Sequence, residues 1–148
     1  MPFVFPLEAV LHFRRSVEHQ QERRLRAANQ LVARARHLIE QVELGMEQSR
    51  REQTAAIRRG TTAAELHFSL HSRAKLTQQR SAMQQELGRL QKLRDELQLI
   101  FYRARRERET LQSLRDRQFD EYRRVEARRE QRRLDDLFLL RRVHQRRS

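Results

Sequence analysis

Apolar residues recur at seven-residue intervals along the first sixty positions, and charged side chains fill most of the positions between them. The members of the main line and of its neighbour are Leu11, Leu25, Val32, Ile39 and Met46, and Ala28, Ala35 and Val42. Such a narrow stripe is typical of a coiled-coil seam and not of a broad globular face. Glu18 interrupts the main line, and Arg14 and Gln21 interrupt its neighbour. The pattern predicts a helix over about 6–58, with Pro6 suited to its first position.

A second line of the same period runs through the rest of the chain. Its apolar members are Leu76, Met83, Leu90, Leu97, Ala104, Leu111, Val125 and Leu139. Gln118 and Arg132 occupy the two polar positions on this line. Because this stretch contains no proline and only one glycine, Gly88, nothing breaks a helix over about 63–143.

A turn signal separates the two predicted helices. Two arginines precede Gly60 and suit the last turn of a helix, and Gly60 can adopt the left-handed conformation that ends one. Thr62, followed three residues later by Glu65, fits a capping box at the start of the next helix. We therefore expect the turn over about 59–62.

The two apolar lines can be folded onto each other about this turn. Positions whose residue numbers sum to 122 pair across the seam: Met46 with Leu76, Ile39 with Met83, Val32 with Leu90, Leu25 with Leu97, and Leu11 with Leu111. Their midpoint, residue 61, falls inside the predicted turn. The sequence thus predicts an all-α fold, a two-helix antiparallel coiled-coil hairpin with a C-terminal helix overhang, as a single domain over 1–148.

The same register leaves the end of the second helix without a partner. Residues 119–143 extend past the start of the first helix by roughly 35 Å. The large apolar residues of this overhang are Phe119, Tyr122, Val125, Leu134, Leu137, Phe138, Leu139 and Leu140. A lone helix that displays so many apolar side chains is expected to bind another molecule.

Composition agrees with long helices and argues against a compact fold with many loops. Charged residues make up 36% of the chain, mean hydropathy is −0.98, and there are only 3 glycines and 2 prolines. The absence of cysteine excludes disulfides and thiolate metal sites. No apolar run is long enough for a membrane span, and the start lacks the pattern of a signal peptide, so we expect the chain in the cytoplasm.

The net charge of +13 is spread evenly over the three thirds of the chain. Such a diffuse positive field fits an acidic partner, a membrane surface or nucleic acid. Paired arginines could contact phosphates, but acids such as Glu107 and Glu126 stand close to them in the sequence. These acids favour a solvated helix face with ion pairs four residues apart, so nucleic acid is not the expected partner.

No arrangement of residues suggests catalysis. There is no glycine-rich phosphate loop and no Ser/His/Asp or Cys/His set, and a two-helix hairpin has no deep pocket that excludes water. His67 and His71 stand four residues apart, but no third ligand accompanies them. We expect no enzyme, no cofactor, no metal site and no small-molecule substrate. Phe3 and Phe5 leave two interpretations open: they pack against the seam, or they insert into a partner.

The opening, from Phe3-Val4-Phe5-Pro6-Leu7 through Val10-Leu11 to Arg14, resembles that of FliJ proteins of the bacterial flagellar type III export apparatus. The late segment Glu130-Gln131-Arg132-Arg133-Leu134-Asp135-Asp136 resembles the E-Q-K-x-L-D-E segment of that family. Arg132 and Asp136 replace the usual Lys and Glu. The resemblance extends over the whole chain, including its length and central turn.

This resemblance implies a stalk-like two-helix coiled coil that couples a hexameric FliI-type ATPase to the FlhA-type export gate and interacts with export chaperones. It also implies a location at the cytoplasmic face of the cell membrane. The implied ATPase-ring contacts are Phe3, Phe5, Leu7, Tyr122, Arg129, Leu134, Asp135, Asp136 and Leu137. The implied export-gate contacts are Leu66, Phe68, Ser72 and Leu76. Ser72 stands where the family has an aromatic residue.

Two alternatives remain open from the sequence. The chain could be the equivalent stalk of a virulence injectisome, the YscO class, with the same fold and mechanism. It could also be a basic coiled-coil scaffold that binds nucleic acid, in which case binding would weaken steeply with salt.

Overall fold

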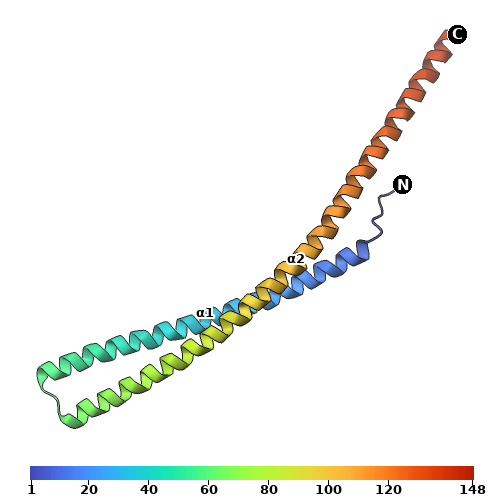
Figure 1. Cartoon of the computed structure of the whole chain (residues 1–148). Coiled ribbons are helices and arrows are strands. Elements are labelled where there is room, and N and C mark those ends of the chain that lie inside the picture. The colour runs from blue at the N-terminus through green and yellow to red at the C-terminus, as the bar shows by residue number, and fades with distance from the viewer. The chain divides into compact units, whose positions relative to one another are not determined.

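The computed structural model describes all 148 residues and consists of two helices, α1 (Glu8–Arg59) and α2 (Ala63–Arg147). The helices pack against each other in opposite directions, and α2 is the longer one (Figure 1). The predicted all-α hairpin is thereby confirmed. Neither helix contains a stretch both long and apolar enough to span a lipid bilayer.

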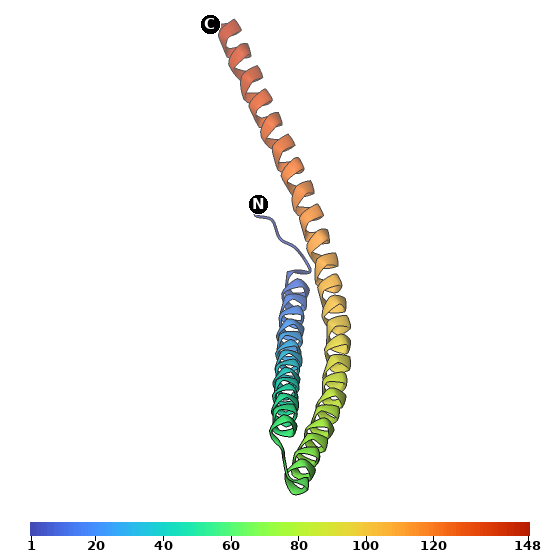
Figure 2. The ribbon, with the colours of Figure 1, turned by 90° about the vertical axis from the view of Figure 1, so that its left-hand side faces the viewer.

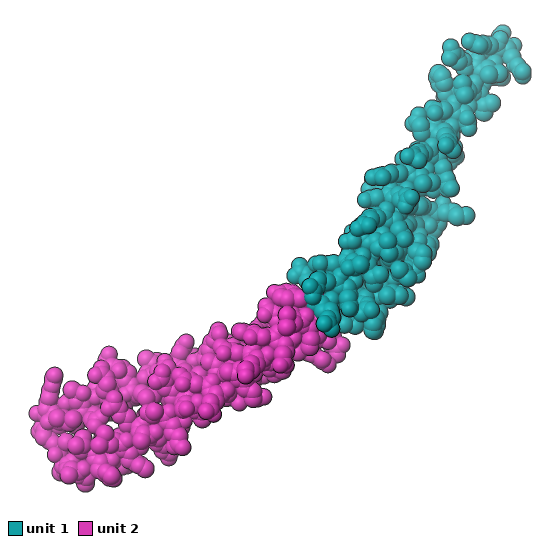
Figure 3. Space-filling view, viewed as in Figure 1, with its two compact units in different colours: residues 1–18, 103–148 teal, residues 19–102 magenta.

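The chain divides into two compact units (Figure 3). Unit 1 combines Met1–Glu18 with Arg103–Ser148, and unit 2 is the continuous stretch His19–Tyr102. Each unit therefore contains part of both helices. The expectation of a single domain stays a prediction.

The turn in unit 2 has the chemistry that its residues suggest. Gly60 has a φ of +88°, and its N–H donates to the carbonyl of Ile57 at 3.3 Å. The Thr62 hydroxyl accepts a hydrogen bond of 3.2 Å from the N–H of Glu65, which caps the start of α2. The Glu65 carboxylate accepts from the hydroxyl of Thr61 at 2.9 Å, so only the first half of the expected capping box forms.

The buried side chains of unit 2 all belong to the predicted seam. They are Ala28, Val32 and Ile39 on α1 and Leu90 on α2. No residue between Ile39 and Leu90 is buried, so the turn-proximal half of unit 2 has no interior of its own. Figure 2 shows the two helices side by side along this unit, joined at the green end by the turn.

In unit 1 the interior is small and includes the start of the chain. Leu11 is fully buried, and Phe5 and Ala104 are buried with it. Residues 127–148, the last part of α2 and the final Ser148, are exposed throughout and have no other segment beside them in either view (Figures 1 and 2). We call residues 127–148 the free segment.

Polar contacts between the helices report the register. The residue numbers sum to 121 for Arg14 with Glu107 and to 123 for Arg80 with Glu43. They sum to 126 for Glu18 with Arg108. The largest difference from the expected sum of 122 is four residues, which is about one helical turn. Long side chains beside a seam can span that distance.

Candidate interaction surfaces

The first seven residues, which we call the N-terminal strap, fold onto α2. The Phe3 ring meets Phe119 edge to face with centroids 5.2 Å apart, and its centroid is 5.5 Å from that of Tyr122. The guanidinium of Arg115 lies 5.7 Å from the centroid of Phe3. The Tyr122 hydroxyl donates to the backbone carbonyl of Met1. These contacts favour the interpretation that Phe3 packs within the chain.

Three strap residues differ in how much of them a partner could reach. Phe5 is 4% exposed and belongs to the interior of unit 1. Phe3 is half-buried under its aromatic contacts, whereas Leu7 is exposed at the start of α1. A partner at this end therefore meets Leu7 and the outer side of Phe3 but cannot reach Phe5 unless the strap moves.

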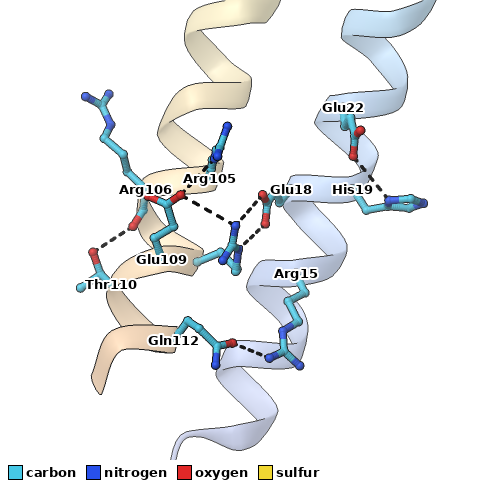
Figure 4. A network of polar contacts seen from close by, with 10 residues as sticks. Arg15, Glu18, His19, Glu22, Arg105, Arg106, Glu109, Thr110 and Gln112 are labelled. Atoms are coloured by element: carbon cyan, nitrogen blue, oxygen red, sulfur yellow. Dashed lines mark hydrogen bonds and ion pairs between the residues drawn. The ribbon is translucent and has the colours of Figure 1, made fainter. Parts of the chain in front are cut away.

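Next to the strap, unit 1 carries a group of ion pairs between the helices. Arg108 donates to both carboxylate oxygens of Glu18, at 2.6 and 3.1 Å, and the two side chains are only 24% and 17% exposed. The hydrogen bonds that Arg108 donates to Glu18, together with the negative charges of Glu18 and Glu109, raise the pKa of Arg108 above its ordinary value. Figure 4 shows Glu18 facing α2, with Arg15 donating to Gln112 below it.

These ion pairs sit where the apolar lines are interrupted. Glu18 and Arg14 break the seam of α1, and each meets an opposite charge on α2, Arg108 and Glu107. Arg115 adds a pair with Glu8 at 3.0 Å. The interruptions therefore form cross-helix contacts. A search for opposite charges at mirrored positions about the turn would have found them in the sequence.

The free segment displays apolar side chains on more than one side of the helix. Successive residues are turned by about 100° around a helix axis. Leu134 and Phe138 therefore lie on one side, Leu139 and Val143 on the opposite side, and Leu140 between them. All five are exposed, Leu134 by 53% and Phe138 by 63%. This distribution fits a partner that contacts the helix from several directions, because a flat partner would need only one apolar stripe.

The turn-proximal part of unit 2 contains a cavity of about 480 Å³. Its lining includes small residues of both helices, Ala56 on α1 and Ala64 and Ser69 on α2, together with Phe68. Phe68 is 71% exposed, so its ring forms an open wall of this cavity. Small side chains leave the two helices incompletely packed here, and the space between them stays accessible.

Comparison with known protein families identifies the chain. The model of the family described as flagellar FliJ protein matches residues 3–148. The chain belongs to the FliJ family. No curated protein and no solved structure matches it. The family is a non-enzymatic component of the flagellar protein export apparatus, with the role of a stalk, and it belongs to the cytoplasmic part of that apparatus. The family match confirms the resemblance of the opening and late segments, and it favours the flagellar over the injectisome assignment.

The residues that the FliJ resemblance implies as ring contacts fall into two groups. The first group, Phe3, Phe5, Leu7 and Tyr122, gathers around the strap. The second group, Arg129, Leu134, Asp135, Asp136 and Leu137, lies exposed along the free segment. In the second group Arg129 pairs with Glu126 at 3.2 Å, and Asp135 accepts from Gln131 at 3.0 Å. The FliJ resemblance did not single out Leu139, Leu140 and Val143, whose exposure marks them as further contact candidates.

The residues implied as FliJ gate contacts all lie early in α2, within unit 2. Leu66, Ser72 and Leu76 are half-buried, and only Phe68 is exposed. Phe68 stands one turn before Ser72, the position at which the resemblance implies an aromatic residue. The accessible ring beside the cavity therefore comes from Phe68.

Proposed function

We propose that the chain is the central stalk that couples a FliI-type hexameric ATPase to an FlhA-type export gate at the cytoplasmic face of the cell membrane. The ATPase ring is contacted by the free segment and the outer side of the strap. The gate is contacted by the early part of α2 around Phe68, and export chaperones are handled along the helix pair. The chain itself performs no chemistry and needs no cofactor.

The observation that carries this proposal is the exposed state of residues 127–148. Every residue of the free segment is exposed, although six of them are large and apolar. Burying a side chain such as Leu or Phe gives about 1.5–3 kcal/mol, so leaving Leu134, Leu137 and Phe138 in water is unfavourable without a partner. A ring that surrounds the helix would cover apolar residues on all of its sides.

The ion pairs and the strap support the coupling part of the proposal. A stalk transmits force only if its two helices do not slide past each other. The bidentate contact of Arg108 with Glu18 connects the two helices, and the packing of Phe3 on Phe119 connects the strap to α2 nearer the free segment. These contacts resist sliding because each must break before the register can change.

Truncation after Glu126 tests the ring assignment. This variant lacks the free segment but keeps Phe119 and Tyr122, which hold the strap. We expect it to lose binding to the FliI-type ATPase and stimulation of ATP hydrolysis, while circular dichroism shows the remaining residues still helical.

The variant Phe68→Ala is the matched control. It should still stimulate the ATPase but bind the FlhA-type gate more weakly in a pull-down. Unchanged ATPase stimulation by the truncated chain would contradict the ring assignment, and unchanged gate binding by Phe68→Ala would contradict the gate assignment.

A further inference from the structure

The C-terminal part of α2, from residue 119 onward, carries its charge unevenly. From residue 119 to residue 136, six arginines are balanced by six acids, so that this stretch is neutral. From residue 137 to residue 148 there are four arginines and no acid. We call residues 137–148 the basic tip.

Neutralisation in the balanced stretch is visible as local ion pairs. Arg129 pairs with Glu126 at 3.2 Å, and Arg133 approaches Glu130 at 3.9 Å. In the basic tip none of the four arginines makes an ion pair. Their charge is therefore fully available to a partner.

The positive charge of the tip also surrounds the helix. At about 100° per residue, Arg141, Arg142 and Arg147 point in three widely separated directions, and Arg146 points close to Arg142. Exposed apolar side chains, Leu137, Phe138, Leu139, Leu140 and Val143, stand between them. A flat anionic surface would be matched by charges and apolar groups sorted onto opposite faces, which is not the case here.

We propose that the basic tip binds an acidic, apolar-lined protein cavity that encloses the end of α2. The inference rests on the proposed function, and it adds the chemistry that the ATPase ring must present. Acidic side chains of the cavity neutralise the four arginines, and its apolar wall covers the leucines and Phe138. Attraction between the charges also speeds the encounter, so binding is expected to weaken with added salt.

A pair of matched variants tests this inference. The tip variant combines Arg141→Gln, Arg142→Gln, Arg146→Gln and Arg147→Gln in the full chain. The control variant combines Arg103→Gln, Arg106→Gln, Arg117→Gln and Arg124→Gln, which removes the same charge from exposed positions of α2 outside the free segment and the strap. Circular dichroism checks that both remain helical. Affinity for the FliI-type ATPase is then measured between low and high salt.

We expect the tip variant to lose about tenfold or more in affinity and most of its salt dependence, and the control to change by less than about threefold. Equal losses in both variants would overturn the inference, because net charge alone would then explain binding. If neither variant changes but truncation after Glu126 abolishes binding, the basic-tip inference is wrong and the ring assignment stands. If truncation also has no effect, both are wrong.

Two further probes separate protein from other anionic partners. The full chain is titrated with vesicles of phosphatidylglycerol and phosphatidylcholine, and separately with duplex DNA. We expect the tip variant to differ little from the control on these probes. If the tip variant loses vesicle or DNA binding while its affinity for the ATPase is unchanged, the tip recognises lipid or nucleic acid, and the inference of a protein cavity is overturned.

Discussion

In unit 1 the strap packs its Phe3 ring on α2, and Arg14, Arg108 and Arg115 form ion pairs with acids on the other helix. The turn-proximal half of unit 2 has a single ion pair between the helices, Arg80 with Glu43 at 3.2 Å, and no buried side chain. The same seven-residue repeat runs through both regions. The repeat therefore sets which face packs, whereas polar and aromatic contacts decide how firmly it packs.

The difference has a thermodynamic consequence. Local stability follows the density of buried contacts, so unit 1 should resist opening more strongly than the turn-proximal half of unit 2. A firmly held region suits contact with a moving partner. A loosely held region can adjust its helices around a bound segment.

The largest expected effect is that of Leu11→Ala in unit 1. Leu11 is fully buried, and its truncation leaves a cavity that should cost about 2–5 kcal/mol of the free energy of unfolding, measured by urea denaturation. Leu44→Ala on the exposed side of α1 is the control, with an expected change below about 0.5 kcal/mol. Similar losses for both would mean that the interior of unit 1 contributes no more to stability than an exposed side chain of unit 2.

Breaking the bidentate ion pair should have an intermediate effect. Arg108→Met leaves the Glu18 carboxylate largely shielded from water without its partner, which should cost about 1–3 kcal/mol. The exposed pair of Arg129 with Glu126 is the comparison, and Arg129→Met should cost about 0–1 kcal/mol. A double-mutant cycle with Glu18→Gln measures the coupling, and a coupling near zero would show that the pair does not clamp the helices.

The smallest changes in stability are expected for alanine substitutions of two glycines, and they should have opposite signs. Gly60 has a positive φ, so Gly60→Ala should destabilise unit 2 by about 1 kcal/mol. Gly45 lies within α1 with nothing within 4 Å of an added Cβ, so Gly45→Ala should stabilise it by about 1 kcal/mol. Thermal unfolding followed by circular dichroism measures both. Changes of the same sign would contradict the turn geometry.

The seam could be predicted because it depends on a simple rule. Val32, Ile39 and Leu90 are buried, as the period indicates, since a repeat of seven returns to the same side of a helix. Gly60 adopts the expected left-handed conformation because glycine has no Cβ and reaches a positive φ without strain. The exposed end of α2 followed from the unequal lengths of the two helices.

The candidate site was less predictable. The sequence left open whether Phe3 packs or inserts, because a short strap ahead of a helix has no period that fixes its position. The seven-residue pattern marks Glu18 only as an interruption, because its partner Arg108 lies 90 residues away in the chain. The cavity beside Phe68 depends on how closely small residues of two helices approach, which periodicity does not encode.

Because the free segment is already helical, it also lowers the free energy that a partner must spend on ordering its backbone. Starting a helix is the unfavourable step, because the first turn fixes several residues for one hydrogen bond, whereas lengthening an existing helix is nearly free. Residues 127–148 continue a helix that has already been started by the packed part of α2. A partner therefore meets an ordered ligand and spends little binding energy on fixing its backbone. The same residues made as a separate peptide would be mostly unfolded in water and should bind more weakly, although every contacting side chain would be present.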